Sequence, residues 1–183
     1  DADGDVWLLD WPVFNVDWYG ARAFAAWAAA RTGQPWRLPG ELAWEKAARG
    51  VDGRFFPWGD GFDPSWASTR RSHRGRPLPT VVGAFPVDES PYGIRDLASN
   101  MCDWCSDVFA KGGPPSASAR RASVSMAEGA PADRRLGAAQ GEVEDATGEA
   151  ARRVYRGGGW NGTASNLRAS NRNRNDPSFC YYS

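Results

Sequence analysis

Residues 153–183 read RVYRGGGWNGTASNLRASNRNRNDPSFCYYS, and the interpretation of the whole chain works outward from this stretch. It begins with a short strand-like run around Val154 and Tyr155, breaks into three glycines and reaches Trp160. The remainder is polar, lacks lysine and glutamate, and holds five of the chain's seven asparagines. Its last five residues follow neither the period of a strand nor that of a helix, so an irregular segment is predicted there.

Two interpretations of the segment after Trp160 are open. Asn, Ser and Gly favour turns, so it could be a frayed polar terminus. However, Leu167, Phe179 and two tyrosines are large apolar residues, which disordered segments lack. The alternative is an ordered, irregular surface held on a rigid body. Amides, hydroxyls and tyrosines together are typical of antibody-like binding surfaces.

Two short helices are predicted in the first third of the chain. Asp17 can cap a helix over residues 18–31, where apolar side chains recur at helical spacing, and Gly33 supplies a stop. A second helix is predicted over residues 41–49, ended by Gly50. The apolar residues in and before this helix are expected to face a core: Trp36, Leu42, Ala43, Trp44 and Ala47.

Composition limits the classes of function. A length of 183 residues suits one domain, and a formal net charge of zero gives no general attraction to nucleic acid. There is no apolar run approaching 18 residues and no signal-like segment, so neither membrane insertion nor a signal peptide is expected. A single histidine, His73, cannot build a histidine metal site or a catalytic triad. Residues 110–151 lack aromatic side chains, which predicts a flexible insertion loop.

The segment 91–107 holds two further candidate groups. Asp96 and Asp103 are seven residues apart around a turn-prone centre, and carboxylates with backbone carbonyls suit a calcium ion. Cys102 and Cys105 form a C-x-x-C pair without the helix start that a redox pair needs, so buried or free thiols are expected. Three cysteines are also too few and too odd in number for a disulfide framework.

Taken in order, five groups of residues carry a resemblance to a known family. They are Pro12-Val13 with Asn15-Val16 and Trp18, then Arg37-Leu38-Pro39 with Glu41 and Trp44, then Phe56-Pro57-Trp58-Gly59, then Tyr92-Gly93-Ile94 with Asp103-Trp104, and Arg153-Val154 with Arg156-Gly157-Gly158. This pattern resembles the formylglycine-generating-enzyme (sulfatase-modifying factor) version of the C-type lectin fold. The resemblance implies a single α+β domain over residues 1–183, with two helices packed on short antiparallel strands and much irregular loop. Residues 1–11 do not match the family's opening strands, and residues 153–183 do not include its closing Gly-Phe-Arg strand.

The resemblance first implies an enzyme that oxidises a sulfatase cysteine to formylglycine. That activity needs a pair of cysteines after the Gly-Gly motif to hold copper(I), and residues 160–167 contain none. We therefore expect a protein that is not an enzyme and binds no copper. Two alternatives stay open. One is a copper oxidase of this type using another thiol pair, such as Cys102 and Cys105. The other is an interaction domain of the same fold without diversification.

The tail is also similar to the variable region of diversity-generating-retroelement variable proteins, which display a hypervariable surface on a C-type lectin scaffold. Randomising template adenines in asparagine codons never yields Trp, Met, Lys, Glu or Gln, and all five are absent from residues 161–183. The resemblance implies a variable ligand-binding region over residues 157–183, with Leu167, Arg168, Arg172 and Pro177 as fixed scaffold positions. The predicted contact residues are Trp160, Gly162, Thr163, Ser165, Asn166, Arg174, Asp176, Phe179, Cys180, Tyr181, Tyr182 and Ser183.

By the same resemblance, one structural calcium site maps onto the side chains of Asp96 and Asp103 and the carbonyls of Ser99 and Met101. The family has Asn and Glu at the two side-chain positions. We expect a monomer of bacterial or phage origin that binds a protein or cell-surface ligand. The sequence leaves open the identity of that ligand and whether the protein resides on a cell surface, on a phage particle or in the cytoplasm.

Overall fold

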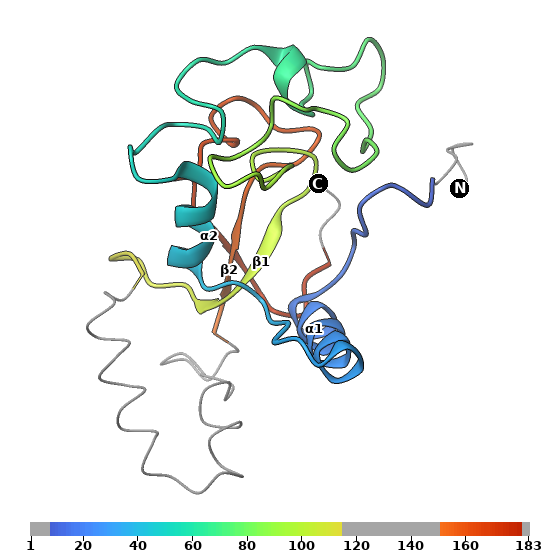
Figure 1. The fold of residues 1–183 in the computed structure, drawn as a ribbon, viewed down its shortest axis with the longest axis vertical. Coiled ribbons are helices and arrows are strands. Elements are labelled where there is room, and N and C mark those ends of the chain that lie inside the picture. Colours follow the sequence, from blue (N-terminus) through green and yellow to red (C-terminus); the bar gives the residue numbers. More distant parts are fainter. Residues whose placement is uncertain (1–7, 115–150, 181–183) are drawn as a thin grey trace, which may run out of the picture.

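The computed structural model describes residues 8–114 and 151–180 (Figure 1). Within them the chain forms two helices, α1 (Trp18–Thr32) and α2 (Glu41–Arg49), and a short 3-10 turn, η1 (Pro64–Trp66). Three strands follow: β1 (Asp103–Val108), β2 (Arg153–Arg156) and β3 (Asn173–Asn175). The predicted α+β architecture, with two helices, short antiparallel strands and long irregular loops, is confirmed. Most of the predicted insertion, residues 115–150, lies outside the described residues.

Local capping sets the bounds of α1. The Asp17 carboxylate accepts a hydrogen bond from the Gly20 amide at 2.6 Å, which satisfies one of the free N–H groups of the first turn. Gly33 then adopts a left-handed φ of 69° and its amide donates to the Ala29 carbonyl. This conformation is costly for other residues, so the helix ends there. The predicted start and stop of α1 are both confirmed.

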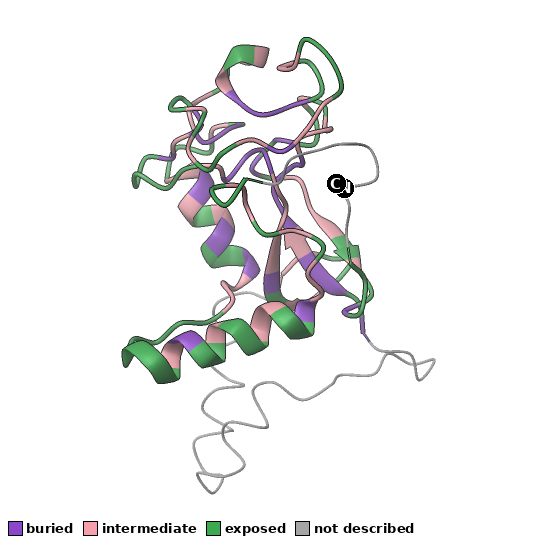
Figure 2. Ribbon diagram, turned by 90° about the vertical axis from the view of Figure 1, so that its right-hand side faces the viewer, coloured by how far each residue is buried: buried purple, intermediate pink, exposed green. Residues whose placement is uncertain are grey.

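The apolar surface of α1 is mostly not buried. Only Trp18 and Ala28 are buried, whereas Phe24 is 65% exposed and Trp27 53% exposed. Figure 2 shows that α1 meets the rest of the domain near its first turn and extends away from it. The expectation that Trp36, Leu42 and Ala43 face a core is also wrong, because Trp36 is 58% exposed, Leu42 is 37% exposed and Ala43 is exposed too.

The sheet has the order β1-β2-β3 and both pairs are antiparallel. Trp104 lies opposite Tyr155, and Val154 lies opposite Arg174. The strand-like run at Val154 and Tyr155 is therefore the central strand. The Asn-rich segment 173–175 is a strand as well, although asparagine is disfavoured in strands. Backbone pairing with β2 supplies the stabilisation that its side chains do not.

The core consists of two adjoining clusters. Trp44 of α2 packs with Leu97, Cys105 and Val154, while Phe56, Ala98 and Leu167 form the second cluster. The glycines after β2 allow these layers to approach closely. A Cβ atom built on Gly158 would lie 3.0 Å from the Ala98 carbonyl oxygen and 2.9 Å from Leu167 Cδ1. The Gly-Gly motif is thus required by packing against the 97–101 loop.

A buried ion network ties the tail to α2. The Arg156 side chain is fully buried, and it donates to Glu41 Oε1 at 3.0 Å and to Glu45 Oε2 at 2.6 Å. Arg172, in the tail, donates to both oxygens of Glu41, to Oε1 at 2.5 Å and to Oε2 at 2.9 Å. Buried charges are tolerated when they are paired and hydrogen-bonded, and both terminal nitrogens of Arg156 meet these conditions, whereas its Nε has no hydrogen-bond partner among the described residues. The network fixes where residues 169–172 lie relative to α2.

Candidate binding site

The tail is an ordered segment in which buried anchors alternate with exposed side chains. Leu167, Ala169 and Pro177 are buried, and the Pro177 carbonyl accepts a hydrogen bond from the Trp18 amide at 2.9 Å. Arg168 is exposed and its guanidinium stacks on Phe55, with Cζ 4.2 Å from the ring centroid. All four of the predicted scaffold positions, including Arg172 in the ion network, therefore contact the body of the domain.

The first group of predicted contact residues lies at the end of β2 that leads into Trp160. Thr163, Ser165 and Asn166 are exposed there. They form a turn in which Asn166 Oδ1 accepts from the Thr163 amide at 3.0 Å and its hydroxyl at 2.8 Å. The Gly162 carbonyl accepts from the Arg70 amide, which joins this turn to the loop that follows η1.

Trp160 and Gly162 are half-buried members of this first group. The Trp160 amide donates to the Asn100 carbonyl at 2.9 Å, and its indole nitrogen is buried without a hydrogen-bond partner in the described part of the chain. A Cβ atom on Gly162 would lie 2.9 Å from the Gly159 carbonyl oxygen, so a larger residue requires this turn to shift. Both positions remain predictions as contact residues.

The second group lies at the opposite end of β2, beside the start of α1. Arg174, Asp176, Phe179 and Cys180 are exposed there. Asp176 Oδ1 accepts from the Ser178 hydroxyl at 2.6 Å and amide at 2.8 Å. These bonds to Ser178 hold the pKa of Asp176 below its usual range. The tail thus presents two exposed patches separated by the length of β2, where the sequence suggested one. Tyr181, Tyr182 and Ser183 lie outside the described residues.

The four predicted calcium ligands lie on one loop and on the first residue of β1. Asp96 has a left-handed φ of 59°, and its Oδ2 accepts from the Gly83 amide at 2.7 Å. Asp103 Oδ2 accepts from the Trp44 indole at 2.8 Å, and the Ser99 carbonyl accepts from the Met101 amide. No cluster of three His, Cys, Asp or Glu side chains forms in residues 8–114 and 151–180, so a calcium ion here would depend on backbone carbonyls. The calcium site stays a prediction.

Two buried carboxylates in this region have perturbed acidity. Burial raises the pKa of Asp88 to about 6, although the Ser99 hydroxyl and the Ala98 amide donate to it. Burial likewise raises the pKa of Asp103 to about 6, partly offset by the hydrogen bond from Trp44. The negative charge of Asp96 adds to both shifts. A bound cation would lower the cost of this concentration of negative charge.

The two thiols of the C-x-x-C pair are poorly suited to hold copper. Cys105 is buried in the core and Cys102 is half-buried. Burial raises the pKa of Cys102 to about 12, and it also raises that of Cys105. The thiolate is the form that binds a metal, and burial disfavours that form at both residues. Cys180 is exposed and belongs to the tail.

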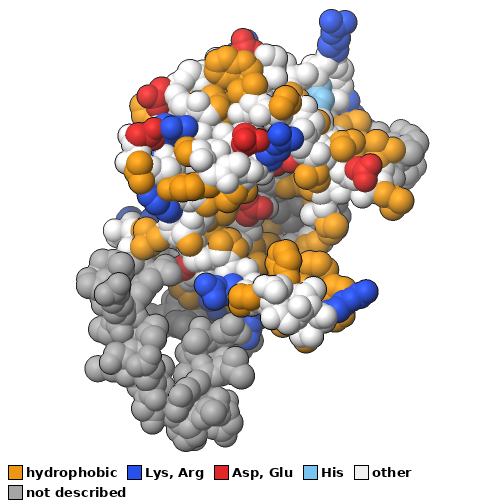
Figure 3. Space-filling model, viewed as in Figure 1, with side chains coloured by type: hydrophobic (Ala, Val, Ile, Leu, Met, Phe, Trp, Pro, Cys, Tyr) orange, Lys and Arg blue, Asp and Glu red, His pale blue; other side chains and the backbone are white. Residues whose placement is uncertain are grey.

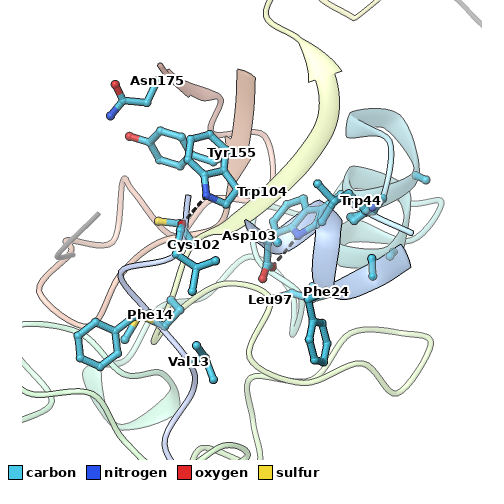
Figure 4. Close-up of a pocket in the computed structure, with 18 of the residues that line it drawn as sticks. Val13, Phe14, Phe24, Trp44, Leu97, Cys102, Asp103, Trp104, Tyr155 and Asn175 are labelled. Atoms are coloured by element: carbon cyan, nitrogen blue, oxygen red, sulfur yellow. Dashed lines mark hydrogen bonds between the residues drawn. The ribbon is translucent and has the colours of Figure 1, made fainter. Parts of the chain in front are cut away.

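Sequence reasoning missed a cavity of about 850 Å³. It lies between α1, residues 13–16, α2 and β1, and its walls are largely apolar (Figure 4). Phe24, Trp36 and Ile94 contribute exposed side chains to it, and Asn175 and Phe179 of the tail also line it. Figure 3 shows hydrophobic side chains on α1 and on the facing part of the domain. The apolar residues of α1 are the only feature of the sequence that could have indicated this cavity. The same residues are equally consistent with a helix packed against a core.

The fold and these sites describe a lectin-like α+β domain with an anchored, irregular tail. The chain matches the sulfatase-modifying factor enzyme 1-like domain family over residues 6–181. It belongs to that family, in agreement with the resemblance carried by the five motifs.

Curated relatives of this family include different kinds of protein. The chain is 30% identical over 167 residues to serine/threonine-protein kinase pkn1 of Chlamydia caviae, which covers 91% of this chain and 22% of the kinase. It is 34% identical to the inactive Cα-formylglycine-generating enzyme 2 of Bos taurus (55% of this chain, 34% of that protein). It is 36% identical to the formylglycine-generating enzyme of Streptomyces coelicolor (54% and 32%). The chain thus spans between about a fifth and a third of these relatives, and the family contains both active and inactive members.

Solved structures confirm the fold. PvdO from Pseudomonas aeruginosa superposes with a TM-score of 0.63 at 24% identity, covering 93% of this chain and 58% of PvdO. Treponema denticola variable protein 1 superposes with a TM-score of 0.60 at 20% identity, covering 94% of this chain and 68% of that protein. Within the described residues, neither helix has the length and apolar composition needed to cross a membrane.

Proposed function

We propose that this domain is a binding module that contacts a protein or cell-surface ligand through its tail, and that a retroelement diversifies the exposed positions of that tail. The observation that carries the proposal is the division of residues 160–180 into buried anchors and exposed side chains. Leu167, Ala169 and Pro177 hold the backbone, while Thr163, Ser165 and others face solvent. Such an arrangement lets the exposed residues change without removing buried contacts.

The similarity to known proteins also supports a binding function, although only at the level of the fold and the family. A protein named as a variable protein has the same fold, and one relative is named as inactive. The raised pKa values of Cys102 and Cys105 argue against the rival function, a copper oxidase, because thiolates are required to hold copper(I). We therefore propose that the domain binds rather than catalyses.

Sequencing the 3′ end of this gene across a population of the source organism tests diversification. Substitutions should concentrate in the codons of exposed residues, such as 163, 165, 166, 174 and 176. The codons of Leu167, Ala169 and Pro177 should stay constant, and a near-identical template carrying adenines should lie nearby. Changes spread evenly over exposed and buried codons, or a tail identical in all isolates, would contradict diversification.

Binding through the tail is tested separately by substitution. The triple variant Thr163→Ala, Ser165→Ala and Arg174→Ala removes exposed side chains from both patches. We expect it to lose binding to a captured ligand while its thermal midpoint stays within a few degrees of wild type. The matched control is Leu167→Ala, which empties a fully buried position and should cost about 2–5 kcal/mol. A collapse of the triple variant would show that these residues belong to the core.

A further inference from the structure

The cavity between α1 and β1 has the size and character of a small-molecule site. Such sites typically enclose roughly 300–1,000 Å³, with mostly apolar walls and a few polar groups that orient the ligand. The cavity here measures about 850 Å³. Its lining contains one side chain that is charged at neutral pH, Asp103, and no lysine, arginine or histidine.

Among the residues that the structure describes, the Asp103 carboxylate has no cationic partner. It lies half-buried in the cavity wall, and among the described residues only the Trp44 indole donates to it, at 2.8 Å to Oδ2. Its second oxygen receives no hydrogen bond from the described part of the chain. A carboxylate in apolar surroundings is costly unless it is paired, so the cavity favours a positively charged guest.

Aromatic side chains beside Asp103 favour the same kind of guest. Trp44, Trp104 and Tyr155 line the cavity together with Asp103, as the close-up shows (Figure 4). Trp104 and Tyr155 pack edge to face, with their ring centroids 5.7 Å apart. The Trp104 indole also donates to the Val16 carbonyl at 3.0 Å, which fixes its orientation. Aromatic faces attract organic cations, most strongly where water is excluded.

We propose that this cavity binds a small organic cation, an amine or quaternary ammonium compound with an apolar body. Its charge would pair with the free oxygen of Asp103, and its apolar body would lie against Trp104 and Phe24. This site does not rest on the proposed function of the tail, because Asp103 and the aromatic walls remain in place if the tail never varies. Asn175 and Phe179 line the cavity, so tail residues would adjust which apolar body fits.

Calorimetric titration tests the proposal with two probes that differ mainly in charge. These are 2-phenylethylamine, which is protonated at pH 7.5, and the neutral 2-phenylethanol. The buffer contains EDTA so that no metal ion competes for Asp103. We expect the wild-type protein to bind the amine at least tenfold more tightly than the alcohol. Addition of the amine should also shift the NMR signal of the Trp44 indole N–H, which is bonded to Asp103.

Variants assign the effect to the carboxylate. Asp103→Asn keeps an oxygen for the Trp44 indole and removes the charge, so the preference for the amine should disappear. The matched control is Glu89→Gln, which removes a charge from an exposed pair with Arg95 outside the cavity lining. It should keep the wild-type preference. If Asp103→Asn fails to fold, the amine-to-alcohol ratio of the wild-type protein still decides the question.

Three outcomes would overturn the proposal. One is equal binding of amine and alcohol by the wild-type protein, which would make the cavity a purely apolar site. Another is binding of neither probe, as expected if an apolar polypeptide segment covers the cavity. The third is a stabilising response to calcium chloride with none to the amine, which would assign Asp103 to the metal site alone.

Discussion

Replacing Glu41 by Gln should lower the free energy of unfolding by about 3 kcal/mol, at the lower end of the range for breaking a buried ion pair. The Glu41 side chain is 1% exposed and that of Arg156 is fully buried. Glu41 accepts three hydrogen bonds: Arg156 donates to Oε1 at 3.0 Å, and Arg172 donates to Oε1 at 2.5 Å and to Oε2 at 2.9 Å. An amide can accept on one side only, so its NH₂ group would face a guanidinium.

The estimate stays at the lower end because Arg156 keeps other partners. It still donates to Glu45 at 2.6 Å and to the Ala169 carbonyl at 2.7 Å. For a domain of this size, about 3 kcal/mol corresponds to a fall of roughly 6–12 °C in the thermal midpoint.

Urea denaturation at pH 7.5, followed by tryptophan fluorescence, measures this loss. The matched control is Glu89→Gln, which breaks an exposed pair with Arg95 and should cost less than about 1 kcal/mol. A loss for Glu41→Gln no larger than that of the control would refute the reasoning, since it would mean that the buried network does not anchor the tail. The urea dependence of the unfolding free energy should stay unchanged, because a changed slope would indicate altered compactness.

Three further predictions concern the loop beneath the tail. Gly158→Ala should destabilise the fold by about 1–3 kcal/mol in thermal or urea unfolding, because its Cβ atom would meet the Ala98 carbonyl and Leu167, whereas Gly75→Ala, with open space around it, should be neutral. The free energy of unfolding should rise as the pH falls from 7 to 5, because the folded-state pKa of Asp88 (about 6) exceeds its unfolded value of 3.8 and the folded state therefore takes up protons first. Between pH 7 and pH 5 the contribution of Asp88 should be about 1 kcal/mol, and it should disappear in Asp88→Asn; a flat profile for the wild-type protein would contradict it. Calcium chloride should raise the thermal midpoint of the wild-type protein more than that of Asp96→Ala, and equal shifts would remove the calcium site.

Features fixed by short-range chemistry could be predicted from the sequence. The start of α1 at Asp17 and the ends of both helices at Gly33 and Gly50 depend on groups within a few residues. The central strand at Val154 and Tyr155 was also visible, since both residue types favour strands.

Features set by distant parts of the chain could not be predicted. Trp36 and Phe24 are apolar at positions that usually face a core, and only the three-dimensional arrangement shows that they line an open cavity. The tail is predicted from the sequence to form one surface. Because Asn175 pairs with Arg153 at the start of β2, the exposed residues after Arg172 lie at the opposite end of β2 from Thr163. That pairing depends on backbone hydrogen bonds, which the order of side chains in the sequence does not predict.

The hydrogen bond between the Trp18 amide and the Pro177 carbonyl joins two points 159 residues apart in sequence at a distance of 2.9 Å. The chain therefore enters and leaves the folded domain at two neighbouring points. Such a domain can be inserted into a surface loop of an unrelated host protein, because the two ends of the host loop need to be only as far apart as Trp18 and Pro177. It can also be permuted, with Pro177 linked to Trp18 by a short connection and new ends opened elsewhere. For protein engineering, the domain is an insertable unit whose two connection points, Trp18 and Pro177, lie next to each other.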